Sequence, residues 1–255
     1  MAIRDMADMT WEEVRDLDRA RTVVVLPVGA IEAHGPHLPL GTDGIIARAM
    51  AREGAERLEA QGLPTLVLPA LPYTAASFAE GFPGTVSIRA ATVTSLLLDL
   101  ARELTRQGFK ALALANAHLD PAHLGAIAEA ERRAREEGLL PIVCPDITRK
   151  PWITRLTEEF RSGACHAGRY EGSIVLAERA DLVREEIRKE LPPNPASISK
   201  AIRSGAKSFE EADGKRAYFG WPADATPDEG RESIEALGAI LAEAVTEALA
   251  PGKSA

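Results

Sequence analysis

The chain has 255 residues, which suits one large α/β domain or two small domains, and its composition is that of an ordinary soluble globular protein. A net charge of −8 at pH 7 argues against nucleic acid or an anionic membrane as a partner. Two cysteines cannot supply a disulfide framework at this length, so a reducing cytoplasm is the expected location.

No targeting or membrane-spanning segment is recognisable in the sequence. The first stretch, MAIRDMADMTWEEVRD, is acidic and lacks the apolar region of a signal peptide. No apolar run approaches the roughly 18–20 residues that a membrane span needs. At the other end, residues 251–255 (PGKSA) are expected to be frayed. We therefore expect a protein without a membrane partner.

Short apolar runs alternate with helical patterns along the chain, as in a parallel sheet covered by helices. The strands are predicted at residues 22–27, 65–68, 111–115 and 140–143. They are apolar throughout rather than at alternate positions, which indicates that both faces of the sheet are buried. The helices are predicted at residues 43–61, 91–107, 121–137, 171–180 and 229–250, and several end in a glycine typical of a helix C-cap.

Residues 191–230 differ from the rest of the chain because they are rich in proline, glycine and charge. This composition predicts an excursion from the core that serves as a lid or a subunit contact. The sequence contains no internal repeat and no low-complexity linker. A single catalytic domain over residues 1–250 is therefore expected.

Histidines and acids follow two of the predicted strands. Glu32 and His34 come after the strand at 22–27, and His118 and Asp120 come after the strand at 111–115. Each pair is spaced i, i+2, so in extended backbone both side chains leave on the same face. Ligands of parallel sheets bind outside the carboxyl ends of the strands, so the two pairs are expected to share one space. Asp43, at the start of the next helix, could bridge them.

These residue types predict a metal centre. Histidine and carboxylate ligands without cysteine suit Zn²⁺, Mn²⁺ or Fe²⁺. The number of ligands suggests two ions about 3.5–4 Å apart, which would hold a hydroxide and lower the pKa of water towards ~7. A third segment, residues 163–183, adds His166 and Glu171 just before a helix. His166 is a candidate general acid or oxyanion stabiliser.

Several of these residues also have a structural explanation. Asp43 could be a helix N-cap, and Asp120 precedes a proline in the manner of a helix entry. Glu171 could be a favourable charge in the first turn of a helix. His123 is expected to face solvent or to cap its neighbour, whereas His37 is expected to fix its loop or to lie behind the ligands.

Three blocks of the sequence resemble the creatininase (creatinine amidohydrolase) family. They are PVGAIEAHGPHLPLGTD at 27–43, NAHLDP at 116–121 and CHAGRYEGS at 165–173. The resemblance extends in order and spacing over nearly the whole chain. It implies a three-layer α/β/α fold with a mostly parallel central sheet, two divalent metal ions (Zn, Mn or Fe) per subunit, a small-molecule amide substrate and a homohexamer.

The resemblance also implies a role for individual residues. The metal ligands that match the family are Glu32, His34, Asp43 as the bridge, and His118, while His166 and Glu171 match the histidine and the acid of the third block. Asp120 stands where creatininase has a functional glutamate, so either Asp120 or Glu171 completes the second metal site. Arg169 replaces a family glutamate and is a candidate for binding an anionic substrate, or a surface residue. Trp152 falls near the aromatic gate of creatininase, or anchors its loop.

The resulting hypothesis is a metal-dependent amidohydrolase that cleaves a non-peptide C–N bond of a cyclic amide or a formamide by a metal-bound hydroxide. His166 would donate to the oxyanion or the leaving nitrogen, and Asp120 or Glu171 would shuttle the proton. One alternative is a creatininase-fold peptidase acting on a small modified peptide precursor. The other is a catalytically silent relative that binds a metal or a ligand. A serine hydrolase and a Rossmann enzyme are disfavoured because G-x-S-x-G and G-x-G-x-x-G are absent.

Overall fold

A single parallel sheet forms the centre of the protein, in a computed structural model that describes residues 4–250. Within that range five strands pair in the order β1-β3-β2-β4-β5, and every pairing is parallel. The strands are β1 (Arg4–Asp5), β2 (Val23–Val28), β3 (Thr65–Val67), β4 (Ala111–Asn116) and β5 (Ile142–Val143). The predicted parallel sheet is confirmed.

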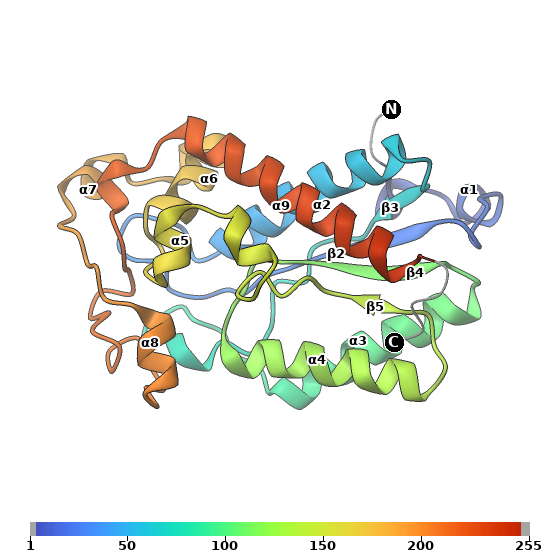
Figure 1. Cartoon of the computed structure of the whole chain (residues 1–255), viewed down its shortest axis with the longest axis horizontal. Coiled ribbons are helices and arrows are strands. Elements are labelled where there is room, and N and C mark those ends of the chain that lie inside the picture. The colour runs from blue at the N-terminus through green and yellow to red at the C-terminus, as the bar shows by residue number, and fades with distance from the viewer. Residues whose placement is uncertain (1–3, 251–255) are drawn as a thin grey trace.

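Helices cover both faces of this sheet, so the architecture has three layers (Figure 1). One face carries α2 (Thr42–Ala60), α6 (Arg169–Arg179) and α9 (Pro227–Ala248), which pack on one another. The opposite face carries α3 (Ala90–Arg106) and α4 (Pro121–Glu136). The α/β/α fold implied by the resemblance is therefore confirmed, and each of the five predicted helices lies within about two residues of its observed bounds.

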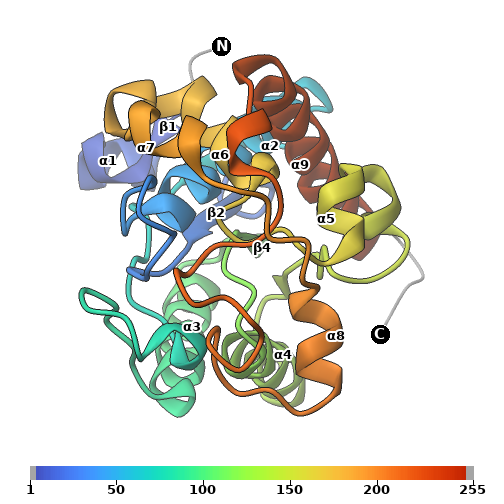
Figure 2. The same ribbon diagram turned by 90° about the vertical axis from the view of Figure 1, so that its left-hand side faces the viewer.

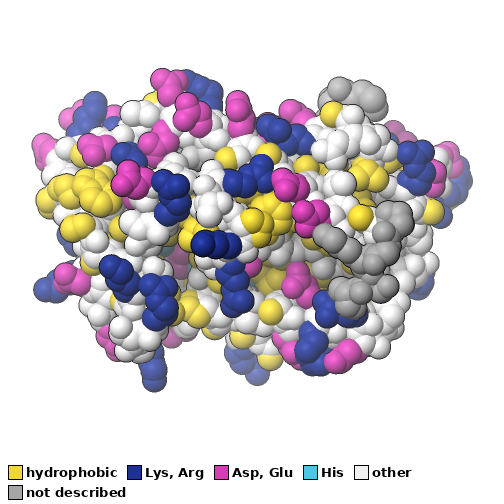
Figure 3. Space-filling model, viewed as in Figure 1, with side chains coloured by type: hydrophobic (Ala, Val, Ile, Leu, Met, Phe, Trp, Pro, Cys, Tyr) yellow, Lys and Arg dark blue, Asp and Glu magenta, His cyan; other side chains and the backbone are white. Residues whose placement is uncertain are grey.

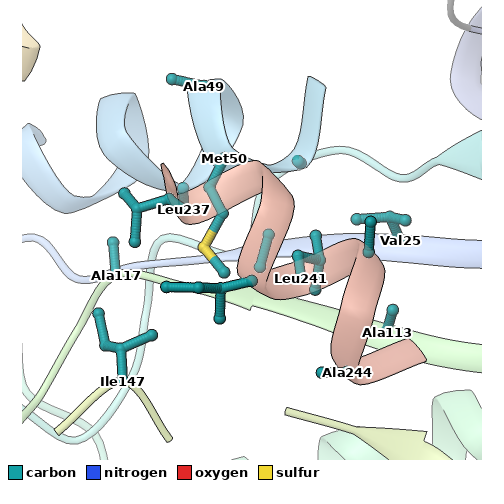
Figure 4. Close-up of a cluster of buried hydrophobic side chains, with 14 of the residues drawn as sticks. Val25, Ala49, Met50, Ala113, Ala117, Ile147, Leu237, Leu241 and Ala244 are labelled. Atoms are coloured by element: carbon teal, nitrogen blue, oxygen red, sulfur yellow. The ribbon is translucent and has the colours of Figure 1, made fainter. Parts of the chain in front are cut away.

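The strands alternate their side chains between two hydrophobic cores, as the two-residue period of extended backbone requires. Val23 and Val25 of β2 face the core under α2 and α9, whereas Val24 and Leu26 face the core under α3 and α4. Figure 4 shows the first core, where Met50 of α2 lies beside residues of α9. Full burial of one such side chain stabilises the fold by roughly 1.5–3 kcal/mol.

Several short elements were not predicted. They are β1 and the helices α1 (Trp11–Arg15), α5 (Glu158–Ser162), α7 (Glu185–Glu190) and α8 (Ile198–Arg203). Helices of five or six residues are too short to show a helical period, and a two-residue strand of charged residues has no apolar run. Local capping signals do mark two of them, because Thr10 begins α1 with a capping box and the Thr157 side chain accepts from the backbone of α5.

The excursion at residues 191–230 folds over the carboxyl ends of the strands, and Figure 2 looks onto this edge of the sheet. An antiparallel bridge between Asn194 and Gly220 closes the segment on itself. Phe209 and Phe219 pack against Phe78 and Ala33 of the loops below. No helix within residues 4–250 is both long and apolar enough to cross a bilayer. The expectation of a frayed tail at 251–255 lies outside the described residues.

Candidate metal centre

The predicted site residues come from four loops and helix starts at the carboxyl edge of the sheet (Figure 2). The loop after β2 carries Glu32 and His34, and the first turn of α2 carries Asp43. His118 follows β4, while His166 and Glu171 lie just before and inside the first turn of α6. All six side chains are buried, although they are polar or charged. Burial of so many ionisable groups requires compensation within the cluster.

Asp43 lies at the centre of this cluster. One carboxylate oxygen, Oδ1, is 3.0 Å from His34 Nε2, and the other, Oδ2, is 3.0 Å from His118 Nδ1. The structural explanation of Asp43 as a helix N-cap is wrong, because α2 begins at Thr42 with Gly41 as its N-cap. The side chain is therefore free to connect two imidazoles that come from different strand ends.

Two glutamates flank Asp43. Glu32 Oε1 lies 3.3 Å from His118 Nδ1 and 3.9 Å from both His34 Nε2 and His166 Nδ1. Glu171 Oε2 lies 3.5 Å from His34 Nε2. Ligand atoms within 4.8 Å of one another form three groups, namely Glu32–Asp43–His118, His34–Asp43–Glu171 and Glu32–His34–His166. Two of the three groups share Asp43.

In each imidazole, the nitrogen that points away from the cluster faces a backbone carbonyl, and this contact fixes which nitrogen carries the proton. His34 Nδ1 lies 3.1 Å from the carbonyl oxygen of Glu32, His118 Nε2 lies 2.8 Å from that of Ala75, and His166 Nε2 lies 2.9 Å from that of Ala33. A carbonyl only accepts, so these nitrogens carry the protons and donate. In the neutral rings the other nitrogen turns a lone pair toward the carboxylates, which is the arrangement of a metal-ligating histidine.

Burial and neighbouring charges both shift the pKa values of the side chains in the cluster, and for His34 the two effects are opposite. Burial opposes the charged form of His34, yet the carboxylates of Asp43, Glu171 and Glu32 raise its pKa to about 10. Burial, strengthened by the neighbouring carboxylates, raises the pKa of Glu171 to about 8. His166 behaves differently, because burial and the nearby His34 hold its pKa well below the usual range. The carboxylates thus favour positive charge in the cluster, while His166 stays neutral.

The donor set fits divalent cations. Among residues 4–250, three buried polar atoms that point into the cluster find no hydrogen-bond partner, namely Glu32 Oε2, His34 Nε2 and Asp43 Oδ2. Unpaired buried polar atoms cost free energy unless something satisfies them. Imidazole nitrogen and carboxylate oxygen together are ligands that Zn²⁺, Mn²⁺ and Fe²⁺ accept. A cation would satisfy these atoms and neutralise the buried carboxylates.

Three other predicted site residues lie outside this cluster. Asp120 lines the same cavity, but its oxygens accept from the Ser77 hydroxyl and from the backbone N–H groups of Phe78 and Ala122. Arg169 forms an ion pair with Glu229. It lines a separate depression with Glu158, Glu159 and Trp221. Trp152 is partly buried against the core, and neither it nor Arg169 is among the cavity-lining residues.

Two further histidines are buried. The expectation that His123 faces solvent is wrong, because its ring is fully buried and Nε2 lies 2.9 Å from Asn116 Oδ1. Asn116 in turn donates from its amide to the carbonyl of His118. His37 is also fully buried, packs edge-on against Tyr218, and belongs to none of the three ligand groups formed by residues 4–250.

A cavity of about 310 Å³ opens onto the cluster. Glu32, His118, His166 and Glu171 line its buried end. Its walls include residues of α5 and of the excursion at 191–230, so this segment helps to enclose the site. Pockets for small molecules span roughly 300–1,000 Å³, so the cavity suits a small ligand.

Sequence reasoning missed several residues that support the site. Buried Glu159 accepts three backbone N–H groups, from Arg169, Tyr170 and Trp221, and so holds the start of α6 in place. Asn116 could have been noticed because it ends an otherwise apolar strand. The carbonyl of Ala75 that orients His118 has no signal in the sequence, because every residue offers a backbone carbonyl.

Comparison with known proteins gives a consistent result. A family model described as creatininase, creatinine amidohydrolase, matches residues 7–245. The chain is 32% identical over 225 residues to the mycofactocin precursor peptide peptidase of Mycobacterium tuberculosis, covering 84% of this chain and 80% of the relative. It is 31% identical over 204 residues to the creatinine amidohydrolase of Pseudomonas putida, covering 74% of this chain and 76% of the relative.

Solved structures agree with the sequence comparison. A manganese form of creatininase superposes with a TM-score of 0.72 and 26% sequence identity, over 98% of this chain and 100% of that one. The family match spans most of the chain and both relatives exceed 30% identity over most of their length. The chain therefore belongs to the creatininase family of hydrolases.

Proposed function

We propose that this hydrolase depends on two divalent metal ions and cleaves the C–N bond of a small amide, either cyclic or a formamide. The observation that carries the proposal is the position of Asp43 between His34 and His118, with an oxygen 3.0 Å from each ring. A carboxylate with its two oxygens facing two separate imidazoles suits a bridge between two cations. The part of the chain that the structure describes leaves three buried atoms of this cluster without a hydrogen-bond partner.

The ligand groups assign residues to each ion. One ion would be held by Glu32, Asp43 and His118, and the other by His34, Asp43 and Glu171. We propose Glu171 rather than Asp120 for the second ion, because the Asp120 carboxylate already accepts three hydrogen bonds from loop and helix groups. When bound, the ions would supply Lewis acidity and make water acidic enough to ionise near neutral pH.

The chain's own groups would then manage the proton. His166 is neutral, and its Nδ1 lone pair faces the cluster because Nε2–H donates to the Ala33 carbonyl. We propose that Nδ1 takes the proton of the attacking water and then returns it to the nitrogen of the leaving group. The Ala33 carbonyl would also stabilise the imidazolium that forms in between. Asp120 would serve by fixing the loop whose Ala75 carbonyl orients His118.

A peptidase that acts on a small modified peptide is the second candidate. The chain is as similar to the mycofactocin precursor peptide peptidases as to creatinine amidohydrolase. The cavity walls also include Ile153, Phe160 and Phe209, which would suit an apolar side chain beside the cleaved bond. The chemistry at the metal centre would be the same for both candidates.

We also propose a cytoplasmic location and a hexameric assembly. Cys144 and Cys165 are both free thiols, which supports a reducing cytoplasm. A homohexamer rests on the family resemblance alone. The excursion at 191–230 is proposed as a lid, because it lines the cavity over the metal centre. Sedimentation of the purified protein would test the hexamer.

The test begins with metal analysis of protein purified without added metal and again after loading with Zn²⁺ or Mn²⁺. The loaded protein is then assayed on creatinine, a second lactam, a formamide and a short peptide. We expect two ions per chain, hydrolysis of at least one amide, and loss of activity on chelation that added metal restores. Protein without stoichiometric metal, or activity that resists chelation, would overturn the proposal. Hydrolysis of the peptide alone would favour the second candidate.

A further inference from the structure

Three cationic side chains surround the open end of the cavity. Arg161 comes from α5, while Lys200 and Arg203 come from α8, so two segments some forty residues apart deliver positive charge to one opening. All three side chains are exposed, whereas the metal-centre residues at the other end of the cavity are buried. Figure 3 shows Lys and Arg side chains gathered over α8 on this face of the molecule.

These cations have no acidic partner within the described part of the chain. Many other arginines do have one, since Arg155 pairs with Glu243 and Arg169 with Glu229. The acids that line the cavity do not neutralise the opening either. Glu32 and Glu171 belong to the metal centre, and the oxygens of Asp120 accept from a hydroxyl and two backbone N–H groups. A chain with a net charge of −8 therefore keeps three unpaired positive charges at the entrance to its cavity.

The cavity walls also carry apolar side chains. Phe160 and Phe209 are buried, and Ile202 is half-buried beside the cations of α8. The cavity thus offers buried carboxylate and imidazole groups at the metal centre, apolar side chains in its walls, and exposed positive charges. A ligand complementary to all three zones has an amide at one end, an apolar middle and an anion at the other end.

We propose that Arg161, Lys200 and Arg203 bind an anionic group, a carboxylate or a phosphate, at the end of the substrate remote from the cleaved amide. This inference rests on the proposed function, which places the amide at the metal centre. The planar guanidinium of arginine can donate two parallel hydrogen bonds to either kind of anion. The aromatic rings of Phe160 and Phe209 would hold the apolar middle of the substrate.

Three probes that share one aromatic scaffold and differ only in the remote group test whether the site prefers an anion. The probes are 4-(methanesulfonamidomethyl)benzoate, the neutral 4-(methanesulfonamidomethyl)benzamide, and 4-(methanesulfonamidomethyl)phenyl phosphate, in which a sulfonamide that the proposed reaction does not hydrolyse stands in for the amide. Calorimetry on the metal-loaded protein gives a Kd for each probe, so the readout does not depend on turnover. Exposed ion pairs are individually weak, so three together should give an anion preference of about 10-fold over the benzamide. The ratio of the benzoate to the phosphate Kd tells which anion fits better.

Variants test whether the three cations cause the preference for anionic probes. The triple variant Arg161→Gln, Lys200→Gln, Arg203→Gln should lower the ratio of neutral to anionic Kd to about one. The charge-keeping variant Arg161→Lys, Arg203→Lys should retain most of it. Lys110→Gln removes one exposed positive charge just before β4, at the opposite edge of the sheet, and serves as the control. A preference carried by these cations should also weaken as NaCl rises.

Equal Kd values for the charged and neutral probes, including failure of all three to bind, would overturn the inference. So would an anion preference that survives in the triple variant, because the anion would then contact the metal centre or another group. A different result would overturn the proposed function. Protein that prefers the anionic probes but holds no metal and hydrolyses no amide would keep the anion site and overturn the metal-dependent reaction.

Discussion

His34 Nε2 lies 3.0 Å from Asp43 Oδ1, and the second oxygen of the same carboxylate lies 3.0 Å from His118 Nδ1. One acid from the first turn of α2 thus joins two histidines that follow different strands. Removing its charge should disturb both metal ions, whereas Glu171 belongs to only one of the two proposed sites. This asymmetry can be measured.

Asp43→Asn should reduce the metal content to well below two ions per chain and lower kcat/KM by more than 100-fold. An amide offers one neutral oxygen where the carboxylate offers two charged ones, so the bridge is lost. Glu171→Gln should instead lose about one ion. Metal analysis of the purified variants checks both, with Asp99→Asn on the exposed face of α3 as the control. Two firmly held ions in Asp43→Asn would contradict the bridging role.

Removal of metal should lower thermal stability. Glu32, Asp43 and Glu171 are buried together, and a cation that binds the folded chain stabilises it by about 2.7 kcal/mol at 100 times Kd. For a chain of this size that corresponds to roughly 5–11 °C in Tm. Scanning calorimetry with and without a chelator measures the shift. In Asp43→Asn the chelator should change Tm much less. A wild-type Tm that is the same with and without the chelator would contradict the prediction that bound ions stabilise the fold.

The sequence pattern predicted the parallel sheet and one part of the site well. Pairs spaced i, i+2 after two strands were enough to bring Glu32 and His34 near His118, because parallel strands end at the same edge. Asp120 also reaches this edge and lines the cavity, but its oxygens accept hydrogen bonds from Ser77, Phe78 and Ala122. The spacing of the pair could not show these contacts, because they come from the loop after β3 and from the start of α4.

Other features depend on contacts between segments far apart in the sequence. Arg169 begins α6 directly after the loop that carries His166, yet its side chain turns to Glu229, sixty residues later. The cationic opening likewise forms only because α8 folds back over α5. A short helix within a segment rich in proline and glycine leaves no periodic signal, so neither its existence nor its position could be predicted.

Asp120→Ala should lower the free energy of unfolding by roughly 2–4 kcal/mol, because it removes a helix cap and two further hydrogen bonds to a buried loop. Activity should fall as well, since this loop carries the carbonyl that orients His118. Denaturant unfolding measures the first effect. Thr10→Ala, which removes an exposed cap, should cost only about 1 kcal/mol. Wild-type stability with lost activity in Asp120→Ala would instead indicate a direct catalytic role.

Glu131 of α4 is a partly buried acid that belongs to none of the three ligand groups formed by residues 4–250. Its Oε1 accepts a hydrogen bond from the backbone N–H of Cys144. Burial raises the pKa of Glu131 to about 7, with Asp146 adding to the shift and Arg135 opposing it. In the unfolded chain the pKa returns to its ordinary value near 4.5. Between these two pH values the unfolded chain is ionised while the folded chain keeps its proton.

Folding stability should therefore fall as pH rises from about 4.5 to 7 because of Glu131, since the unfolded state binds fewer protons there. Glu131→Gln stays neutral at every pH and can still accept from Cys144. Relative to wild type it should be similar near pH 4.5 and more stable by roughly 1–3 kcal/mol above pH 7, at about 1.4 kcal/mol per unit of pKa shift. Denaturant unfolding between pH 5 and 8 measures the difference. Glu129 is an acid on the same helix that is ionised throughout this pH range. The Glu129→Gln variant should therefore differ from wild type in unfolding free energy by an amount that does not change with pH. If the unfolding free energies of Glu131→Gln and wild type also differ by a constant amount, Glu131 is ionised in the folded protein.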